Sequence, residues 1–412
     1  MKYLIARPRA RILFSMMLFR KSLLALTFTA SVAAAQDIDL TPLVSSVGLT
    51  DTILALKDDE PSPGRNFALG GVLFLRGIEK TLQLRYRHNA DFGKLGMPVL
   101  RLPLPPNPEA TPFYPGLVTD LFRDLGTDMQ GARTVLTNVQ GDFGVILDLT
   151  RVWFDINENG ARDKGEGLMS AAGAAFGRAA PQSDLNSLVV RFDAADAAWL
   201  TAYTHLLEAF TDVVLAFDPT EVIADVSQSI DAMSDLRGAQ PNSRQSYLRG
   251  FESWVDTFAM FYGALNRQPD PVHTRALREN LLAMVAQNRR FWDLLALETD
   301  NDREWIPGTG QVSAMGIELP KDAGSLWMKV LDDAEGLLEG RLLAPHWRVE
   351  PAAGVNVARL LQNPIPVDIV TWVHGHGLLP YMEQGPLVDD GNLRQFEQMF
   401  RGDALLFMVW LN

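Results

Sequence analysis

The sequence predicts a mainly α-helical protein: an antiparallel helical bundle with short irregular or β segments near an acidic loop and in the C-terminal region. Three observations favour this fold class. Apolar residues recur at helical spacing over residues 193–342, helix-start signals punctuate that stretch, and prolines cluster at 98–115 and after residue 343. The chain has 412 residues, 47% hydrophobic and 21% charged, which is typical of a globular protein with a sizeable core.

The clearest predicted helix runs from Asp193 to Phe217. Its large apolar residues lie alternately four and three positions apart, which places them on one face. Asp193 is the expected N-cap, and Asp196, three residues on, completes a capping box. The stripe consists of Trp199, Tyr203, Leu206, Phe210, Val213 and Phe217.

Further helices follow, and two of them begin with an Asp–Pro pair. Asp218–Pro219 and Asp270–Pro271 each supply a cap and then a proline at the first helical position, where its missing N–H costs nothing. Short connections predict that the first four helices of this block are consecutive antiparallel neighbours, with their stripes, including Trp254, in the core. The predicted ranges are about 219–237, 243–265, 271–295 and 322–342.

The regions on either side of this bundle are less regular. Before it, we expect helices over 40–57, 65–88 and 117–138, with a proline-rich loop at 98–115. After residue 343, prolines divide the chain into short pieces, and residues 368–374 are the best strand candidate. The expected organisation after residue 35 is an N-terminal helical region (36–192), a helical bundle (193–342) and a mixed C-terminal region packed on the bundle (343–412).

The first 35 residues have the pattern of a cleavable signal peptide. Residues 1–21 contain six basic residues and no acidic one, and an apolar run then leads into Ala33–Ala34–Ala35. This run is about 11 residues long, short of the roughly 20 that span a bilayer. We therefore expect cleavage between Ala35 and Gln36, secretion or a periplasmic location, and no transmembrane segment in the mature chain.

Composition excludes several classes of function. The chain has no cysteine, so it has no disulfide, thiol nucleophile or zinc–thiolate site. Its net charge is −13, and cleavage after Ala35 leaves 31 basic and 50 acidic residues, a balance of −19. A protein that neutralises phosphates needs the opposite balance, so we expect no nucleic-acid partner.

Residues 155–166 carry the strongest chemical signal. Oxygen-bearing side chains at positions 1, 3, 5, 9 and 12 of this segment point inward if it forms a tight loop, and Gly160 at position 6 permits the positive φ that turns the chain. A carbonyl at position 7 completes a set of hard oxygen ligands that suits Ca²⁺. The predicted calcium ligands are Asp155, Asn157, Asn159, Ala161 (through its carbonyl), Asp163 and Glu166.

This spacing resembles the EF-hand calcium loop, and the resemblance covers these 12 residues. Arg162 and Lys164 beside three carboxylates indicate an affinity nearer the extracellular range of about 10⁻⁴ to 10⁻³ M, and therefore a structural site rather than a sensor. The alternating apolar residues of 142–154 leave the entering segment open between helix and strand. The whole chain loosely resembles secreted bacterial proteins in which such a loop precedes a helix like 192–200, and this implies no activity.

Two weaker metal candidates remain. Asp300, Asp302 and Glu304 also place oxygens at alternate residues, but Trp305 stands where glycine is needed, so a second cation competes with a capped, solvated turn. His374 and His376 would lie on one face of a strand and, with His346 or a carboxylate, would suit zinc. The alternative is a pair of histidines in a glycine-containing loop.

The sequence names no reaction, and two classes of function remain open. The leading hypothesis is a calcium-stabilised helical binding or scaffold protein of the bacterial envelope. The alternative is a calcium-dependent hydrolase or lyase acting on an envelope glycan or extracellular polymer, with acids such as Glu208, Asp256 or Glu304 in a cleft. A pocket with two carboxylates roughly 5 to 9.5 Å apart would favour the hydrolase.

Overall fold

The computed structural model describes residues 37–90, 102, 104–170, 187–237, 249–349 and 353–400. The predicted signal peptide and its cleavage site lie outside the described residues. None of the helices in the described part of the chain combines the length and apolar character needed to cross a membrane.

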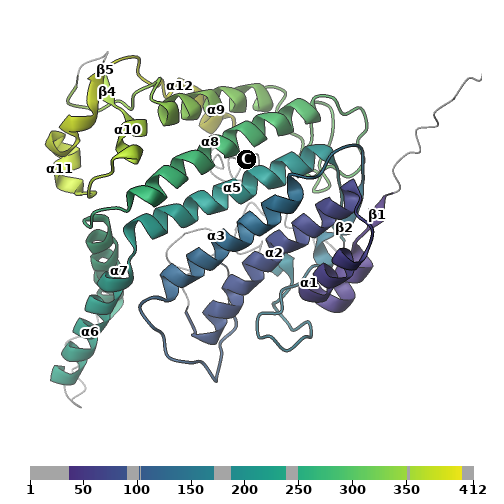
Figure 1. Cartoon of the computed structure of the whole chain (residues 1–412), viewed down its shortest axis with the longest axis horizontal. Coiled ribbons are helices and arrows are strands. Elements are labelled where there is room, and N and C mark those ends of the chain that lie inside the picture. The colour runs from purple at the N-terminus through teal and green to yellow at the C-terminus, as the bar shows by residue number, and fades with distance from the viewer. Residues whose placement is uncertain are drawn as a thin grey trace, which may run out of the picture. The chain divides into compact units, whose positions relative to one another are not determined.

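The mainly α-helical class is confirmed, and four long helices form the centre of the fold (Figure 1). Packing runs in series: α2 contacts α3, α3 contacts α5, and α5 lies along α8 over most of its length. Helix α1 covers α2, and α9 covers α8. The bounds are α1 Thr41–Asp58, α2 Pro63–Arg87, α3 Leu117–Leu136, α5 Ala194–Phe217, α8 Pro271–Leu295 and α9 Ala323–Glu339.

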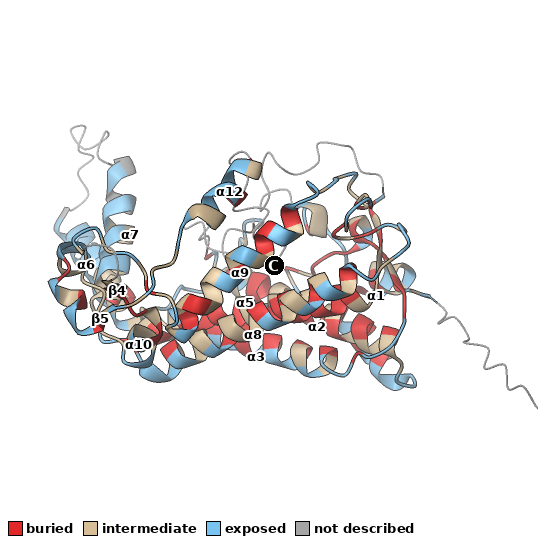
Figure 2. Cartoon of the chain, turned by 90° about the horizontal axis from the view of Figure 1, so that it is seen from above, coloured by how far each residue is buried: buried red, intermediate tan, exposed pale blue. Residues whose placement is uncertain are grey.

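Helix α5 is buried between α3 and α8 (Figure 2). Its most buried positions are small residues rather than the large apolar stripe, whose members are mostly half-buried. Small side chains let neighbouring helices approach closely, so α5 contributes a narrow centre around which larger residues pack. The buried small residues are Ala195, Ala197, Ala198, Ala202, Ala209 and Ala216, with Thr201, Thr204 and Thr211.

The helix starts that the sequence predicts are confirmed at two places. The Asp193 carboxylate accepts a hydrogen bond from the Ala195 N–H at 2.8 Å, and Asp196 accepts one from the Asp193 N–H at 3.0 Å, which forms the capping box of α5. Asp270 caps α8 by accepting from the Val272 N–H at 2.8 Å. Both caps satisfy backbone donors that have no partner within the helix.

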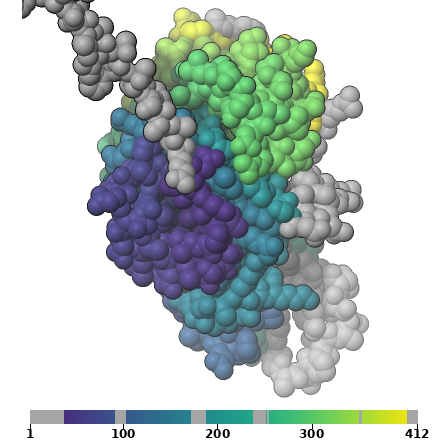
Figure 3. All heavy atoms as spheres, turned by 90° about the vertical axis from the view of Figure 1, so that its right-hand side faces the viewer, coloured from purple at the N-terminus to yellow at the C-terminus, as the bar shows by residue number. Residues whose placement is uncertain are grey.

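A three-stranded sheet leads into the acidic loop. Strand β1 (Ile38–Asp39) pairs in parallel with β2 (Val145–Asp148), which pairs antiparallel with β3 (Val189–Phe192). A short 3₁₀ helix, η2 (Leu149–Arg151), follows β2. The segment entering the loop is therefore a strand followed by a 3₁₀ turn. The N-terminal and loop regions lie side by side, as the purple and teal atoms of Figure 3 show.

The predicted strand at 368–374 is wrong, because Ile369–His374 forms helix α11. The Asp368 carboxylate caps this helix by accepting from the Val370 and Thr371 N–H groups at 2.9 and 3.3 Å, and Gly375 ends it at φ 97°. A cap and a left-handed glycine seven positions apart fix this short helix, although its β-branched and aromatic residues favour a strand. The other C-terminal elements are β4 (Ala353–Val355), α10 (Val357–Gln362), η4 (His376–Tyr381), β5 (Met382–Gln384) and α12 (Gly391–Met399).

The prediction of consecutive helical neighbours is also wrong. Helices α6 (Thr220–Arg237) and α7 (Arg249–Leu265) pack on each other, while the chief partners of α5 are α8 and α3. The Asp270 N–H donates to the Ala216 carbonyl at 2.8 Å, so the start of α8 lies next to the end of α5. The chain between them, which contains α6 and α7, leaves the bundle and returns to it, and we call it the α6–α7 excursion. Trp254, expected in the core, lies on this excursion and is 66% exposed.

Two glycines on adjacent helices give a matched test of the α2–α3 packing. A Cβ on Gly70 would lie 2.6 Å from Cγ and Cδ2 of the buried Leu136, whereas a Cβ on the exposed Gly131 would meet nothing within 4 Å. We expect Gly70→Ala to lower the free energy of unfolding by about 1 to 2 kcal/mol through overpacking. Gly131→Ala should raise it by about 0.5 to 1 kcal/mol through helix propensity. Urea unfolding measures both, and equal signs would contradict the packing.

Candidate functional site

The acidic loop is closed at its base by β-type pairing rather than by two helices. The Phe154 N–H donates to the Glu166 carbonyl at 2.8 Å, and the Leu168 N–H donates to the Val152 carbonyl at 2.9 Å. Trp153 and Gly167 form a bridge between these two bonds. The resemblance to an EF-hand is thus confined to the loop, because β2 and η2 precede it in place of an α-helix.

The side chains of the first three predicted ligands accept hydrogen bonds from the backbone of the turn at residues 159–161. Asp155 Oδ2 accepts from the Gly160 N–H at 3.0 Å, and its Oδ1 accepts from the Asn159 N–H at 3.0 Å. Asn157 Oδ1 accepts from the same Asn159 N–H at 3.1 Å, and Asn159 Oδ1 accepts from the Ala161 N–H at 2.8 Å. The side chains at positions 1, 3 and 5 therefore turn inward, as an oxygen-ligand loop requires.

The last two ligands close the loop from the other side. Asn157 Nδ2 and Asn159 Nδ2 both donate to Asp163 Oδ2, at 2.7 and 2.8 Å. Glu166 is 2% exposed, and its two oxygens accept separately from the Ile156 N–H at 2.9 Å and the Asp163 N–H at 2.7 Å. A carboxylate that presents both oxygens toward the loop interior has the orientation of a bidentate calcium ligand.

Backbone conformation explains why glycine is needed at position 6. Gly160 has a φ of 73°, and Glu158, two residues earlier, has a φ of 60°. Left-handed conformations favour glycine, which has no Cβ. Gly160 therefore adopts its conformation without strain, whereas Glu158 adopts one that is unfavourable for its side chain. Glu158 also forms an ion pair with Arg87 of α2, at 2.9 Å, so its carboxylate is directed away from the loop interior.

Helix α2 holds the start of the loop through two further contacts. Glu79 Oε1 accepts from the Asp155 N–H at 2.6 Å, and Gln83 Nε2 donates to the Asp155 carbonyl at 2.7 Å. Glu79 is almost fully buried, and burial raises its pKa to about 7, although the Asp155 N–H and the Arg76 guanidinium oppose this shift. Both backbone groups of the first ligand are thus fixed by side chains one helical turn apart.

The donor set of the loop fits calcium better than a transition metal. Three carboxylates, two amide oxygens and one carbonyl are hard oxygen ligands, and the loop contains no imidazole or thiolate. Within the described residues no three histidine or acidic side chains gather tightly enough to hold a metal by themselves. A cation in this loop would therefore depend on Asn157, Asn159 and the Ala161 carbonyl as well as on its carboxylates.

The second acidic loop lies against the N-terminus of α5. Glu304 Oε1 accepts from the Asp302 N–H at 2.9 Å, and Asp302 pairs with Arg303. Gln311, at the position of a closing ligand, donates to the Asp300 carbonyl at 2.8 Å. Asp300, Asp302 and Glu304 therefore form a hydrogen-bonded turn, and a second cation there stays an open prediction.

This turn brings carboxylates together from two distant parts of the chain. Burial raises the pKa of Asp196 well above its ordinary value, and the negative charges of Asp193, Glu298 and Glu304 add to the rise. Burial and the charges of Asp193, Glu304 and Asp300 raise the pKa of Glu298 to about 8, although a hydrogen bond from Gln311 opposes this shift. The pKa values of Asp193 and Glu304 are raised in the same direction, first by burial.

The two histidines that the sequence suggests for zinc lie on different helices. His374 ends α11 and His376 begins η4, with their Nδ1 atoms 3.3 Å apart. His346 instead points its Nε2 to the Trp372 carbonyl at 3.1 Å. His374 and His376 are adjacent as the sequence predicts, but they do not lie on one face of a strand, and His346 is engaged elsewhere.

The three candidate hydrolase acids do not meet among the described contacts. Glu208 lies on α5 and is bonded to Gln130 and Arg133 of α3. Glu304 lies in the second acidic loop, and Asp256 lies on α7, half-buried. Glu208 therefore holds two helices together rather than facing a cleft.

A second polar group joins α5 to α8. Asn280 Nδ2 donates to Asp212 Oδ2 at 3.0 Å, so its Oδ1 faces His205, whose Nδ1 lies 2.8 Å away and must donate. Burial lowers the pKa of His205, which favours this neutral form. His273 Nδ1 lies 3.0 Å from Asp212, whose pKa is raised by burial against the pull of His273 and Asn280.

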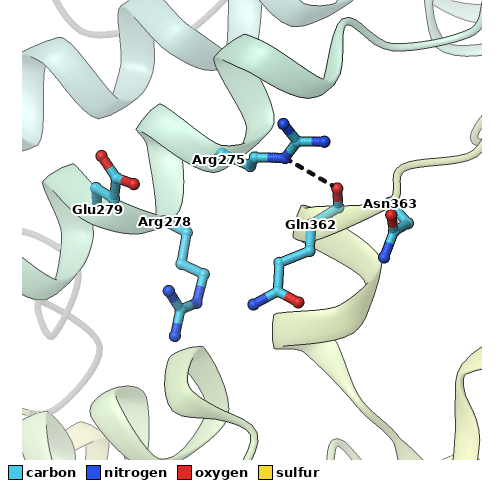
Figure 4. A pocket seen from close by; sticks show the side chains of 5 residues that line it. All are labelled: Arg275, Arg278, Glu279, Gln362 and Asn363. Carbon is cyan, nitrogen blue, oxygen red and sulfur yellow. Dashed lines mark hydrogen bonds between the residues drawn. The ribbon is translucent and has the colours of Figure 1, made fainter.

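A pocket of about 380 Å³ lies between α8 and the end of α10 (Figure 4). Arg275 Nε donates to the Gln362 carbonyl at 3.2 Å, and Arg278 Nε donates to the Leu338 carbonyl at 2.5 Å. These bonds fix the orientation of both guanidinium groups, and Glu279 and Asn363 complete the lining. With one carboxylate, this pocket lacks the carboxylate pair that the hydrolase hypothesis requires.

Comparison with family models, with curated proteins and with solved structures gave no match to the chain. Sequence reasoning missed the contacts of Glu79 and Gln83 with the loop, because these residues lie 76 and 72 positions from Asp155. It also missed the meeting of Asp196 with Glu298, which no local spacing signals.

The carboxylates around Asp196 predict a pH dependence of stability. A carboxyl group whose pKa is raised by folding binds its proton more tightly in the native state, so stability falls as pH rises from about 4.5 to about 8. We expect Glu298→Gln to resemble wild type at pH 5 and to unfold at a temperature higher by a few degrees at pH 8.

Glu335→Gln is the matched control, because the Arg289 guanidinium lowers the pKa of Glu335. Its difference from wild type should stay constant between pH 5 and pH 8. Thermal unfolding in EDTA across this range measures both variants. A difference for Glu298→Gln that is independent of pH would contradict the charge repulsion inferred for this group.

Proposed function

We propose that the protein is a secreted or periplasmic calcium-binding protein that acts as a binding or scaffold protein of the bacterial envelope. The observation that carries the proposal is the inward orientation of the side chains at positions 1, 3, 5, 9 and 12 of the loop. These are Asp155, Asn157, Asn159, Asp163 and Glu166. The compartment rests on the N-terminal sequence pattern, and the acidic charge gives no support for a nucleic-acid partner.

A structural role for calcium is supported by what the loop connects. Its base continues β2 through η2, and its first ligand is held by α2 at Glu79 and Gln83. An ion bound by residues 155–166 would draw together carboxylates that otherwise repel one another, and so would stabilise the junction between the sheet and α2.

A sensor role has less support. Calcium sensors respond by changing the angle between two helices that flank each loop. Here Phe154 and Leu168 bond across the base of the loop to Glu166 and Val152. In the described part of the chain the segment entering the loop is β2 followed by η2, so the α-helix that precedes the loop in a sensor is not present there.

The calcium-dependent hydrolase stays the alternative because of one observation. The pKa values of Glu298 and Glu304 are both raised, first by burial, and the charge of Glu304 adds to the rise at Glu298. Pairs of carboxyl groups with raised pKa values can divide acid and base roles in glycosidases. Release of reducing ends from peptidoglycan or an acidic polysaccharide, by wild type but not by Glu298→Gln, would favour it. The binding-protein proposal expects no release by either.

Calcium should raise the thermal stability of the mature protein, and a pair of Glu→Gln substitutions in one loop tests whether residues 155–166 are responsible. Ligand at 100 times its dissociation constant adds about 2.7 kcal/mol, which moves the unfolding midpoint by about a degree or more in a chain of this length. We expect wild type and Glu158→Gln to shift between EDTA and millimolar calcium, because Glu158 points away to Arg87. Glu166→Gln should lose most of the shift.

Calorimetric titration of the same three proteins counts the bound ions. One ion lost in Glu166→Gln supports the loop. An unchanged shift in Glu166→Gln would move the calcium site elsewhere, with the carboxylates around Asp196 as the next place to examine. No shift in wild type would refute the calcium proposal.

A further inference from the structure

Helix α7 exposes a continuous apolar surface, which we call the α7 face. It contains large side chains that a monomeric protein normally buries, and Phe251, Trp254 and Phe258 are 68%, 66% and 62% exposed. Phe258 and Tyr262 stack with ring centroids 5.8 Å apart. The α7 face consists of Phe251, Trp254, Val255, Phe258, Phe261 and Tyr262.

The spacing on α7 is that of a helix that packs against another helix. Large apolar residues lie alternately three and four positions apart along α7, at Phe251, Trp254, Phe258, Phe261 and Leu265. This spacing forms the contact seam between two helices that pack side chains of one between side chains of the other. Asp256 lies on the opposite side of the helix from this seam. A partner that covers the seam would therefore leave the Asp256 carboxylate uncovered.

The partner of α7 within the chain occupies a different side of the helix. A Cβ on Gly263 would lie 2.7 Å from Val222 Cγ1 of α6, and the neighbouring Ala264 is buried. Helix α6 thus packs on the small residues of α7 near its C-terminal end, and the aromatic residues stay exposed. Figure 2 shows α7 largely in the colour of exposed residues. Ile230 and Met233 of α6 are exposed as well.

We propose that the α7 face is covered by the α7 face of a second copy of this chain. At about 200 Å² for a fully exposed large side chain, the six residues offer on the order of 650 Å² per copy. A stable interface of standard size buries roughly 600 to 1,000 Å² per partner, and exposed patches this large are unusual on monomers. Two identical seams meet across a two-fold axis, so one surface serves both copies.

The charges of the α6–α7 excursion favour this occupant over a membrane. Helices that lie on bilayers carry lysine and arginine on their polar face, whereas α6 and α7 together contain six acidic and two basic residues. The acidic residues of α6 lie away from its apolar stripe, so they stay in solvent when two copies associate. Their repulsion is weakened by salt, while the apolar contact is not.

Sedimentation equilibrium of the mature chain tests the proposal, with one variant on the α7 face and one matched control. We expect wild type to form a dimer and Phe258→Asp to raise its dissociation constant about a hundredfold or more, because each dimer carries the substitution twice. Leu54→Asp, at a residue of α1 that is 58% exposed, should leave association unchanged. Equal thermal midpoints for the two variants as monomers show that the chain still folds.

The absence of cysteine permits a direct readout of the contact. Val255→Cys places the only thiol of the chain beside the seam, and we expect it to cross-link two copies under mild oxidation, whereas Leu54→Cys does not. A monomer at every concentration, or a dimer that survives Phe258→Asp, would overturn the proposal. Binding to phosphatidylcholine vesicles without dimerisation would replace it with a membrane surface.

Discussion

The burial of α5 between α3 and α8 is the constraint on which the rest of the structure depends. Alanine and threonine occupy its most buried positions, so the helices on either side approach closely. Larger residues of α2, α3 and α8 then fill the space around this narrow centre. On the sides of α5 that face α3 and α8, a buried polar side chain needs a defined partner, because burying it without one costs free energy.

Those partners join α5 to both neighbours. Glu208 bonds to Gln130 and Arg133 on one side, and Asp212 bonds to Asn280 and His273 on the other. Removing one member of such a contact leaves a desolvated group unpaired, which costs more than an intact pair contributes. The polar contacts therefore fix the register of three helices, while the apolar contacts supply most of the stability.

The same central helix connects the two acidic regions. Strand β3 leads directly into the capping box of α5, and its partner β2 leads into the loop at 155–166. The carboxylates near Asp196 face the start of α5, where the helix dipole favours negative charge, yet burial and mutual repulsion still raise their pKa values. The loop, in contrast, is anchored by α2 through Glu79 and Gln83 and stays at the edge of the bundle.

The sequence by itself determined the features that depend on neighbours along the chain. Helical periodicity, the caps at Asp193 and Asp270, and the oxygen spacing of residues 155–166 are all local, and the structure contains each of them. A cap at Asp368 was equally local, but the β-branched and aromatic residues after it favoured a strand where the structure has a short helix.

Only the tertiary structure decided which apolar stripes are buried. The stripes of α5 and α7 have the same spacing, yet α5 lies inside the bundle and Trp254 of α7 lies in solvent. Periodicity defines a face but not what covers it, because the energy of burial comes from residues far away in the chain. The hydrogen bond from Asp270 to Ala216 brings the chain back to the bundle after α7. It joins residues more than fifty positions apart, so no local sequence pattern predicts it.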